Sequence, residues 1–230
     1  MHEMPMPGGW TMSMMWLRMP GQSWPGALAS FLGMWVVMTA AMMLPSLIPT
    51  LWKSRPFLGW STAVVAAGHF LVWTLLGMIM YPVGVALVAI ALRQPALARA
   101  VPVATGVVIL IAGLVQRTGW KAHALTVCRD ATRGLAQVDH LHSAWRHGLC
   151  LGLHCVQSCA ALMAIALVMG AMNLRVMALV TAAISLERLA PSGVRIARAV
   201  GLVALVAGLF VIAVSRERAS SRGQIHALGR

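Results

Sequence analysis

Long apolar runs constrain the fold of this chain more than any other feature of its sequence. Most of them approach the roughly 20 residues that a helix needs to cross a bilayer. A helix satisfies its backbone hydrogen bonds internally, so a long apolar segment in lipid is expected to be helical. The runs occupy residues 27–49, 61–81, 101–115, 148–170, 173–186 and 199–214.

These runs predict about six membrane spans, with five or seven as alternatives. The uncertain piece is 83–92, which extends the second helix past Tyr81-Pro82, forms a short surface helix or enters the membrane partway. Composition agrees with a membrane protein, because 60% of the residues are hydrophobic and only 10% are charged. The predicted fold class is therefore all-α, a polytopic transmembrane helical bundle, located in the cell inner membrane.

Three regions follow from this organisation. Residues 1–26 are rich in methionine, proline, glycine and tryptophan, and they predict an interfacial segment. Residues 27–215 form the transmembrane domain, which includes a longer connection at 116–146 that reads as an amphipathic surface helix with turns. Residues 216–230 form a basic tail. The first 26 residues lack the basic start and continuous apolar stretch of a secretory signal.

The net charge of +13 first suggests a nucleic-acid partner. However, the basic residues lie at helix ends and in connections, and they form no stripe interleaved with aromatic side chains. Anionic lipid headgroups explain them better, so the expected partner is the bilayer and not a nucleic acid. A membrane or periplasmic protein partner is also expected. The orientation in the membrane stays open, because basic residues are divided nearly equally between the two sides.

Motifs of common enzymes are absent from the sequence. It contains no glycine-rich phosphate loop, no G-x-S-x-G elbow and no H-E-x-x-H. Its acids number only five, which excludes a carboxylate-bridged di-iron bundle. Whether the protein is an enzyme is left open.

The stretch "HGLCLGLHCVQSCAALM" at 147–163 places reactive side chains in an apolar run. Cys155, Cys159 and Met163 are four residues apart and share one helical face, with His154 on a neighbouring flank. Thiolate and imidazole suit soft transition metals, and an imidazole at membrane depth is costly without a partner. The alternative is plain packing, since buried cysteine behaves as a small hydrophobe. The four cysteines do not indicate a disulfide framework.

A second group of sulfur side chains lies in the first apolar run, "MWVVMTAAMMLP". Met38 and Met42 follow Met34 at four-residue spacing, and Met43 is adjacent. Thioethers are ligands for Cu(I), although a methionine stripe in lipid is more often packing. Pro45 is expected to bend or end this helix.

Other polar side chains occupy the remaining runs. Asn173 and Glu187 fall on one side of the run "MNLRVMALVTAAISLER", where they would support a metal site or handle protons; Glu187 otherwise pairs with a neighbouring arginine. His69 is read as either a ligand or a satisfied interhelical donor. Cys128 lies in the long connection, where it would add a site of metal uptake or be an incidental exposed thiol.

The ordered motifs resemble those of the bacterial DUF2182 family, described as predicted metal-binding integral membrane proteins. They are "PGGWTMSMMWLRMPGQSW", "MWVVMTAAMMLPS", "CR", "WRHGLCLGLHCVQSCAALM" and "GAMNLRVMALVTAAISLERLAP", and they run from Pro7 to Pro191. The resemblance implies metal binding without specifying the metal. Family members carry "CxGCCWALM" where this chain has "CVQSCAALM", so one cysteine and a tryptophan are missing, and Arg188 replaces a lysine.

The leading hypothesis is a membrane protein that binds a soft transition metal, most plausibly a copper ion, in an intramembrane pocket for metal handling. The predicted ligands are Cys155, Cys159 and His154, with Met38, Met42 and Met163 as secondary candidates. Asn173 and Glu187 are predicted as supporting groups. The alternatives are a subunit of a membrane-bound metal-dependent oxidoreductase, a structural membrane scaffold without metal, and a transporter for metal or small molecules, which the few intramembrane charges and the lack of an inverted repeat disfavour.

Overall fold

A computed structural model provides the structure of the chain. It describes residues 3–6, 10–13, 16, 21–53, 60–133, 141–170 and 173–228. Much of the predicted interfacial segment 1–26, part of the connection 116–146 and the last two residues of the basic tail lie outside these ranges.

Helices make up nearly all of the described chain, as the apolar runs predict. Near the N-terminus a two-stranded antiparallel hairpin places Met4 opposite Met12 and Met6 opposite Trp10. The elements are β1 (Glu3–Met6), β2 (Trp10–Ser13), α1 (Trp24–Lys53), α2 (Trp60–Arg93), α3 (Pro95–Arg117), α4 (Gly119–Arg133), α5 (Leu141–Gly170), α6 (Leu174–Leu189) and α7 (Gly193–Leu228).

Five of the described helices are long and apolar enough to cross a bilayer: α1, α2, α3, α5 and α7. The run at 173–186 was expected to be a sixth span, but α6 has only 16 residues. At 1.5 Å per residue it extends about 24 Å, less than the roughly 30 Å hydrocarbon core. The helix α6 therefore packs among the longer helices without meeting the length of a span.

Proline does not end either of the first two helices. The helix α1 continues past Pro45 to Lys53, so of the two expectations for this residue, a bend or an end, the end is excluded. In α2, Pro82 lies inside one continuous helix, which is the first of the three alternatives for 83–92. Aromatic packing surrounds this part of α2, because the Tyr81 and Phe31 ring centroids are 5.1 Å apart. Neighbouring helices make an internal proline tolerable in a membrane helix.

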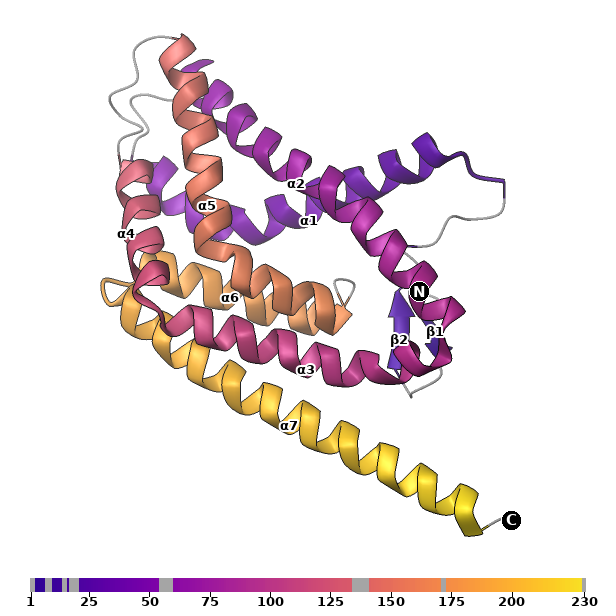
Figure 1. Cartoon of the computed structure of the whole chain (residues 1–230). Helices are drawn as coiled ribbons and strands as arrows, with labels where there is room; N and C mark the ends of the chain where they lie inside the picture. Colours follow the sequence, from indigo (N-terminus) through magenta and orange to yellow (C-terminus); the bar gives the residue numbers. More distant parts are fainter. Residues whose placement is uncertain are drawn as a thin grey trace.

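Figure 1 shows how the helices are arranged. The helices α3 and α7 run side by side, α1 crosses α2, and α6 lies between the α3–α7 pair and α1. The helix α5 packs against α2 and also contacts α3, α4 and α6. The short α4 thus joins a core that α5 and α6 share, which brings the long connection toward the centre of the fold.

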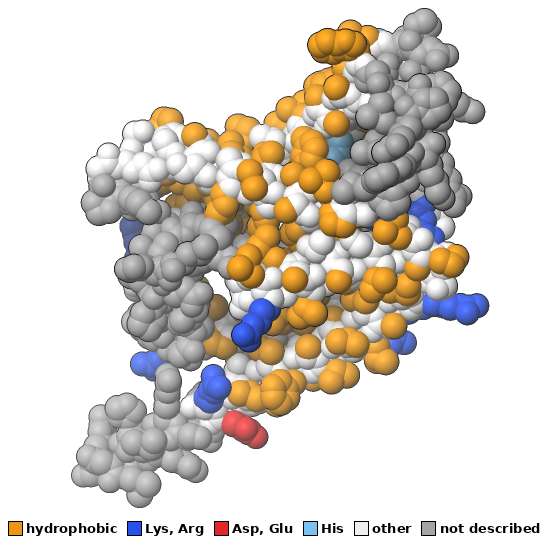
Figure 2. Space-filling view, turned by 180° about the vertical axis from the view of Figure 1, so that it is seen from behind, with side chains coloured by type: hydrophobic (Ala, Val, Ile, Leu, Met, Phe, Trp, Pro, Cys, Tyr) orange, Lys and Arg blue, Asp and Glu red, His pale blue; other side chains and the backbone are white. Residues whose placement is uncertain are grey.

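The surface supports placement in lipid. Figure 2 shows hydrophobic side chains over most of the described face, with scattered basic side chains. On α7, Val203, Val206 and Phe210 are all more than 60% exposed. Contiguous apolar surface of this kind is rare on soluble monomers, and here it belongs to helices of membrane-spanning length.

Candidate metal centre

The helix α4 turns one face into the protein core. Lys121, Leu125 and Cys128 are each at most 2% exposed, and their spacing of four and three residues places them on one helical side. The sequence predicted a surface helix for this connection and an exposed thiol at Cys128. The exposed thiol is wrong, because the inner face of α4 packs on α5 and α6, whereas Trp120 and His123 on its other face are exposed, as in an amphipathic helix.

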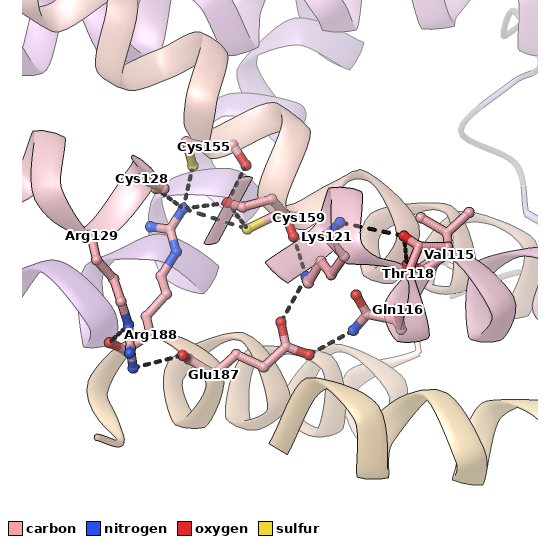
Figure 3. Close-up of polar contacts among 11 residues, drawn as sticks. Val115, Gln116, Thr118, Lys121, Cys128, Arg129, Cys155, Cys159, Glu187 and Arg188 are labelled. Carbon is pink, nitrogen blue, oxygen red and sulfur yellow. Dashed lines mark hydrogen bonds and ion pairs between the residues drawn. The ribbon is translucent and has the colours of Figure 1, made fainter. Parts of the chain in front are cut away.

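Three cysteine sulfurs surround one nitrogen atom of Arg188 (Figure 3). Cys155 and Cys159 come from α5, Cys128 comes from α4, and Arg188 extends from the last turn of α6. The distances from Arg188 Nη2 are 2.8 Å to Cys155 Sγ, 3.3 Å to Cys128 Sγ, 3.4 Å to Ser158 Oγ and 3.5 Å to Cys159 Sγ. Helices distant in sequence therefore bring three thiols to one point inside the fold.

A methionine from α1 extends this cluster. Met43 is fully buried, and its Sδ atom lies 3.7 Å from Cys155 Sγ. We call the sulfur atoms of Cys128, Cys155, Cys159 and Met43 the sulfur centre. Its donors come from three helices, and all four residues belong to the same buried core.

A buried ion pair lies beside the sulfur centre. Lys121 Nζ is 2.8 Å from Glu187 Oε2, and both side chains are at most 3% exposed. Gln116 Nε2 donates to Glu187 Oε1 at 2.6 Å, and Lys121 also donates to the backbone carbonyl of Ser158. These bonds tie α3, α4, α5 and α6 together. The sequence suggested an arginine neighbour as the partner of Glu187, whereas the structure provides Lys121.

Arg129 holds the end of α6 against α4. Its Nε donates to the carbonyl of Arg188 at 2.9 Å, and its Nη2 donates to the carbonyls of Glu187, at 2.9 Å, and Ala190. The last carbonyls of a helix lack intrahelical donors, so a guanidinium satisfies them and complements the helix dipole. This contact fixes the turn from which Glu187 and Arg188 extend.

The side-chain charges of Lys121, Glu187 and Arg188 sum to one positive charge unless a cysteine is ionised. Burial raises the pKa of Glu187, but the charge of Lys121 opposes this effect, and the 2.8 Å contact is that of an ion pair. Arg188 leaves one further positive charge. Burial also raises the pKa of the Cys128 thiol, with Arg188 opposing it in part. A negative charge shared by the cysteines would balance Arg188, so the arginine favours the thiolate form of a cysteine over the neutral thiol.

The structure brings together only part of the predicted ligand set. Cys155 and Cys159 meet at Arg188 as described. Met38, Met42 and Met163 lie in the same buried core, each at most 7% exposed. His154 is half-buried, and its Nδ1 lies 3.4 Å from Gln157 Oε1. Metal binding by these residues stays a prediction.

The two predicted supporting residues lie in different surroundings. Glu187 is buried next to the sulfur centre, where it can support it. Asn173 is exposed at the start of α6, and its Oδ1 accepts from the backbone nitrogens of Arg175, at 3.1 Å, and Val176, at 3.4 Å. This geometry is that of a helix N-cap.

The donor set suits copper, but the present arrangement does not hold a metal. Thiol and thioether sulfurs are soft ligands that favour Cu(I). Within the described ranges, no group of three or more His, Cys, Asp or Glu side chains is positioned to hold a metal ion. The guanidinium of Arg188 stands among the sulfurs, so a metal at that position requires this group to move.

Sequence reasoning underweighted Cys128, Met43, Lys121 and Arg188. The chain contains one signal for Cys128, which is its position seven residues after Lys121 on the apolar side of α4. Only one other lysine occurs in the chain, and a lysine next to a buried acid becomes visible only when α4 and α6 meet. Arg188 immediately follows Glu187 near the end of an apolar run. The sequence does not show whether its side chain points into the protein core or toward the membrane interface.

Comparison with known proteins identifies the family. Neither a curated protein nor a solved structure matches the chain. A family model described as "PpoB2: Copper chaperone" matches residues 32–211, which include all of the sulfur centre and the buried ion pair. The match does not test the DUF2182 name. Because it covers well over half of the 230 residues, the chain belongs to the PpoB2 copper chaperone family.

Proposed function

We propose that this protein carries Cu(I) as cargo at the sulfur centre, inside its membrane domain. The observation that carries the proposal is the approach of three cysteine sulfurs to within 3.5 Å of a single nitrogen atom. Membership in a copper chaperone family supports a role in copper handling. The proposed ligands are Cys155, Cys159 and Cys128, with Met43 as a thioether donor.

The chemistry of the centre fits a soft monovalent ion. Sulfur donors select Cu(I), whereas harder cations such as Mg²⁺ and Ca²⁺ require oxygen ligands. The acid nearest the centre, Glu187, is already engaged by Lys121 and Gln116. A cysteine must lose its proton to become a thiolate ligand, and the adjacent positive charge of Arg188 favours that loss.

Arg188 gives the proposal a specific loading step. Its Nη2 atom occupies the region where the three sulfurs meet, and ligation at roughly 2.0–2.3 Å leaves no room for a metal and a guanidinium together. Copper loading therefore moves the Arg188 side chain out of the centre. From a position beside the sulfurs, its charge still balances the thiolates. When the copper ion leaves, the Arg188 guanidinium returns to its position among the sulfur atoms.

The cellular setting follows from the same proposal. Five helices of spanning length support a multi-pass membrane domain around the sulfur centre, and we assign this domain to the inner membrane. A chaperone delivers its cargo, so the protein requires a membrane or periplasmic partner that accepts copper. Neither basic patches nor base-stacking platforms are part of this role, and no nucleic acid is involved.

Metal analysis of the purified protein tests the proposal. The protein is loaded with Cu(I) under reducing, anaerobic conditions in detergent, and bound copper and affinity are measured by competition with a chromophoric chelator. We expect the Cys155→Ser/Cys159→Ser variant to bind Cu(I) more than about 100-fold more weakly, because loss of direct ligands exceeds the usual cost of losing a supporting residue.

Cys150→Ser is the matched control, because Cys150 is a free, exposed cysteine on the same helix. It should bind copper as the unmodified protein does. Circular dichroism verifies that all variants keep their helical content. Equal copper affinity in the double variant and the unmodified protein would contradict the proposal and favour a structural role for the sulfurs.

A further inference from the structure

His69 is a buried imidazole without a hydrogen-bond partner. It lies in the third turn of α2 and is only 2% exposed, and neither of its ring nitrogens has a partner among the described residues. Its ring makes an edge contact with the adjacent Phe70, with centroids 5.5 Å apart. The sequence left two alternatives for His69, and the structure removes the satisfied interhelical donor. Buried polar atoms are rarely left unpaired, so this imidazole requires another explanation.

Two further polar groups near His69 share this property. Trp73 Nε1, one turn later on α2, and Thr39 Oγ1 on α1 are also buried without a partner in the described chain. The two helices meet here, because Trp35 Nε1 donates to the Trp73 carbonyl at 2.9 Å. Thr39 follows Trp35 by one turn on α1. The unpartnered polar groups thus lie on facing segments of α1 and α2.

The backbone of His69 lies next to the helix that carries the sulfur centre. A Cβ atom added at Gly152 would lie only 3.1 Å from the His69 carbonyl oxygen. Cys155 follows Gly152 by three residues, which is a rise of about 4.5 Å along α5. Glycines at 148 and 152 allow this close approach of α2 and α5.

Two contacts join Cys155, which follows Gly152 closely on α5, to side chains of neighbouring helices. Met43, two turns after Trp35 on α1, reaches Cys155 with its sulfur at 3.7 Å. Arg188 Nη2, from α6, lies 2.8 Å from the same Cys155 sulfur. The His69 backbone and the sulfur centre therefore both lie against the same short stretch of α5, residues 152–159.

We propose that His69 is a nitrogen ligand of the copper ion, contributed from the α2 side of the sulfur centre. The inference rests on the proposed copper-carrying function and adds a ligand of a different chemical class. Neutral imidazole binds copper well, and an imidazole without hydrogen bonds can turn toward a metal without breaking any. Withdrawal of Arg188 on loading frees the position among the cysteines, which His69 would approach from α2.

X-ray absorption at the copper edge tests this ligand directly. The unmodified protein loaded with Cu(I) should show nitrogen and sulfur scatterers around one copper. In His69→Leu the nitrogen scatterer should disappear while the sulfur scatterers remain, and Cu(I) affinity should fall by roughly 10- to 100-fold. His154→Leu tests the other imidazole that the sequence predicted as a ligand, and the matched control is His142→Leu, since His142 is exposed at the start of α5. This control should leave spectrum and affinity unchanged.

The outcomes separate the two proposals. Sulfur scatterers without nitrogen in the unmodified protein would overturn the role of His69 and leave the sulfur site standing. Loss of nitrogen in His154→Leu but not in His69→Leu would also overturn it. Absence of bound copper in the unmodified protein would overturn both proposals. The spectrum of the unmodified protein decides the presence of nitrogen even when a His69 variant folds poorly.

Discussion

The α3–α7 interface and the sulfur centre are both sites where helices approach closely, but different forces hold them. Between α3 and α7, backbones approach at paired glycines: a Cβ at Gly208 would lie 3.0 Å from the Gly106 carbonyl, and one at Gly201 would lie 2.8 Å from the Gly113 carbonyl. At the sulfur centre, the contacts are an ion pair, hydrogen bonds and sulfur atoms around a guanidinium.

The difference shows what spacing alone indicates in a membrane helix. Gly106 and Gly113 are seven residues apart, as are Gly201 and Gly208, while Cys155 and Cys159 are four apart. All of these spacings define one face of a helix. Small residues on such a face provide van der Waals packing, which drives helix association in lipid. Thiols on such a face can form a binding site only when other helices bring a cationic side chain and further sulfur atoms close to them.

The largest expected effect on stability comes from breaking the buried ion pair. Lys121→Met should lower the free energy of unfolding by about 3–5 kcal/mol, because it leaves the buried Glu187 carboxylate without its cation. Equilibrium unfolding in mixed detergent micelles measures this change. Arg198→Met is the control, since Arg198 is exposed, and it should change stability little. Similar small losses in both variants would mean that the pair does not hold the helices together.

A smaller effect is expected at the glycine interface. Gly208→Ala places a methyl group against the Gly106 carbonyl and Leu110, and overpacking should cost about 1–3 kcal/mol. Copper affinity should not change, because the contact lies away from the sulfur centre. The same unfolding experiment and a Cu(I) titration check both statements. Gly33→Ala is the control, since nothing lies within 4 Å of its added Cβ. A loss of copper affinity in Gly208→Ala would mean that packing between α3 and α7 affects the sulfur centre.

The smallest effect is expected at the start of α6. Asn173→Ala removes the N-cap and should cost about 1 kcal/mol, while Asn173→Asp, which also caps well, should retain most of the stability. Thermal unfolding of the two variants gives this comparison. Copper affinity should be unaffected in both. If Asn173→Ala weakens copper binding more than tenfold, as a supporting residue would, Asn173 belongs to the metal site as the sequence predicted.

The residues of the sulfur centre differ in how well a local sequence pattern predicts them. Cys155 and Cys159 could be chosen from sequence because their spacing and their apolar surroundings belong to one helix. Cys128 could not, because an amphipathic helix looks the same whether its apolar face meets lipid headgroups or a protein core. Among the methionines, Met42 and Met43 are adjacent, and which of them reaches a cysteine depends on the rotation of α1 against α5. In the structure it is Met43.

By itself, the sequence determined that this chain forms apolar helices of membrane-spanning length and that sulfur side chains share faces of two of them. Those properties depend on hydropathy and helical periodicity, which are local. Only the tertiary structure decided that α4 turns inward, that Lys121 neutralises Glu187, and that Arg188 extends among three cysteines. The physical reason is that the partner of a buried charge depends on which side chains the packing of distant helices places nearby. A local sequence pattern contains no information about that packing.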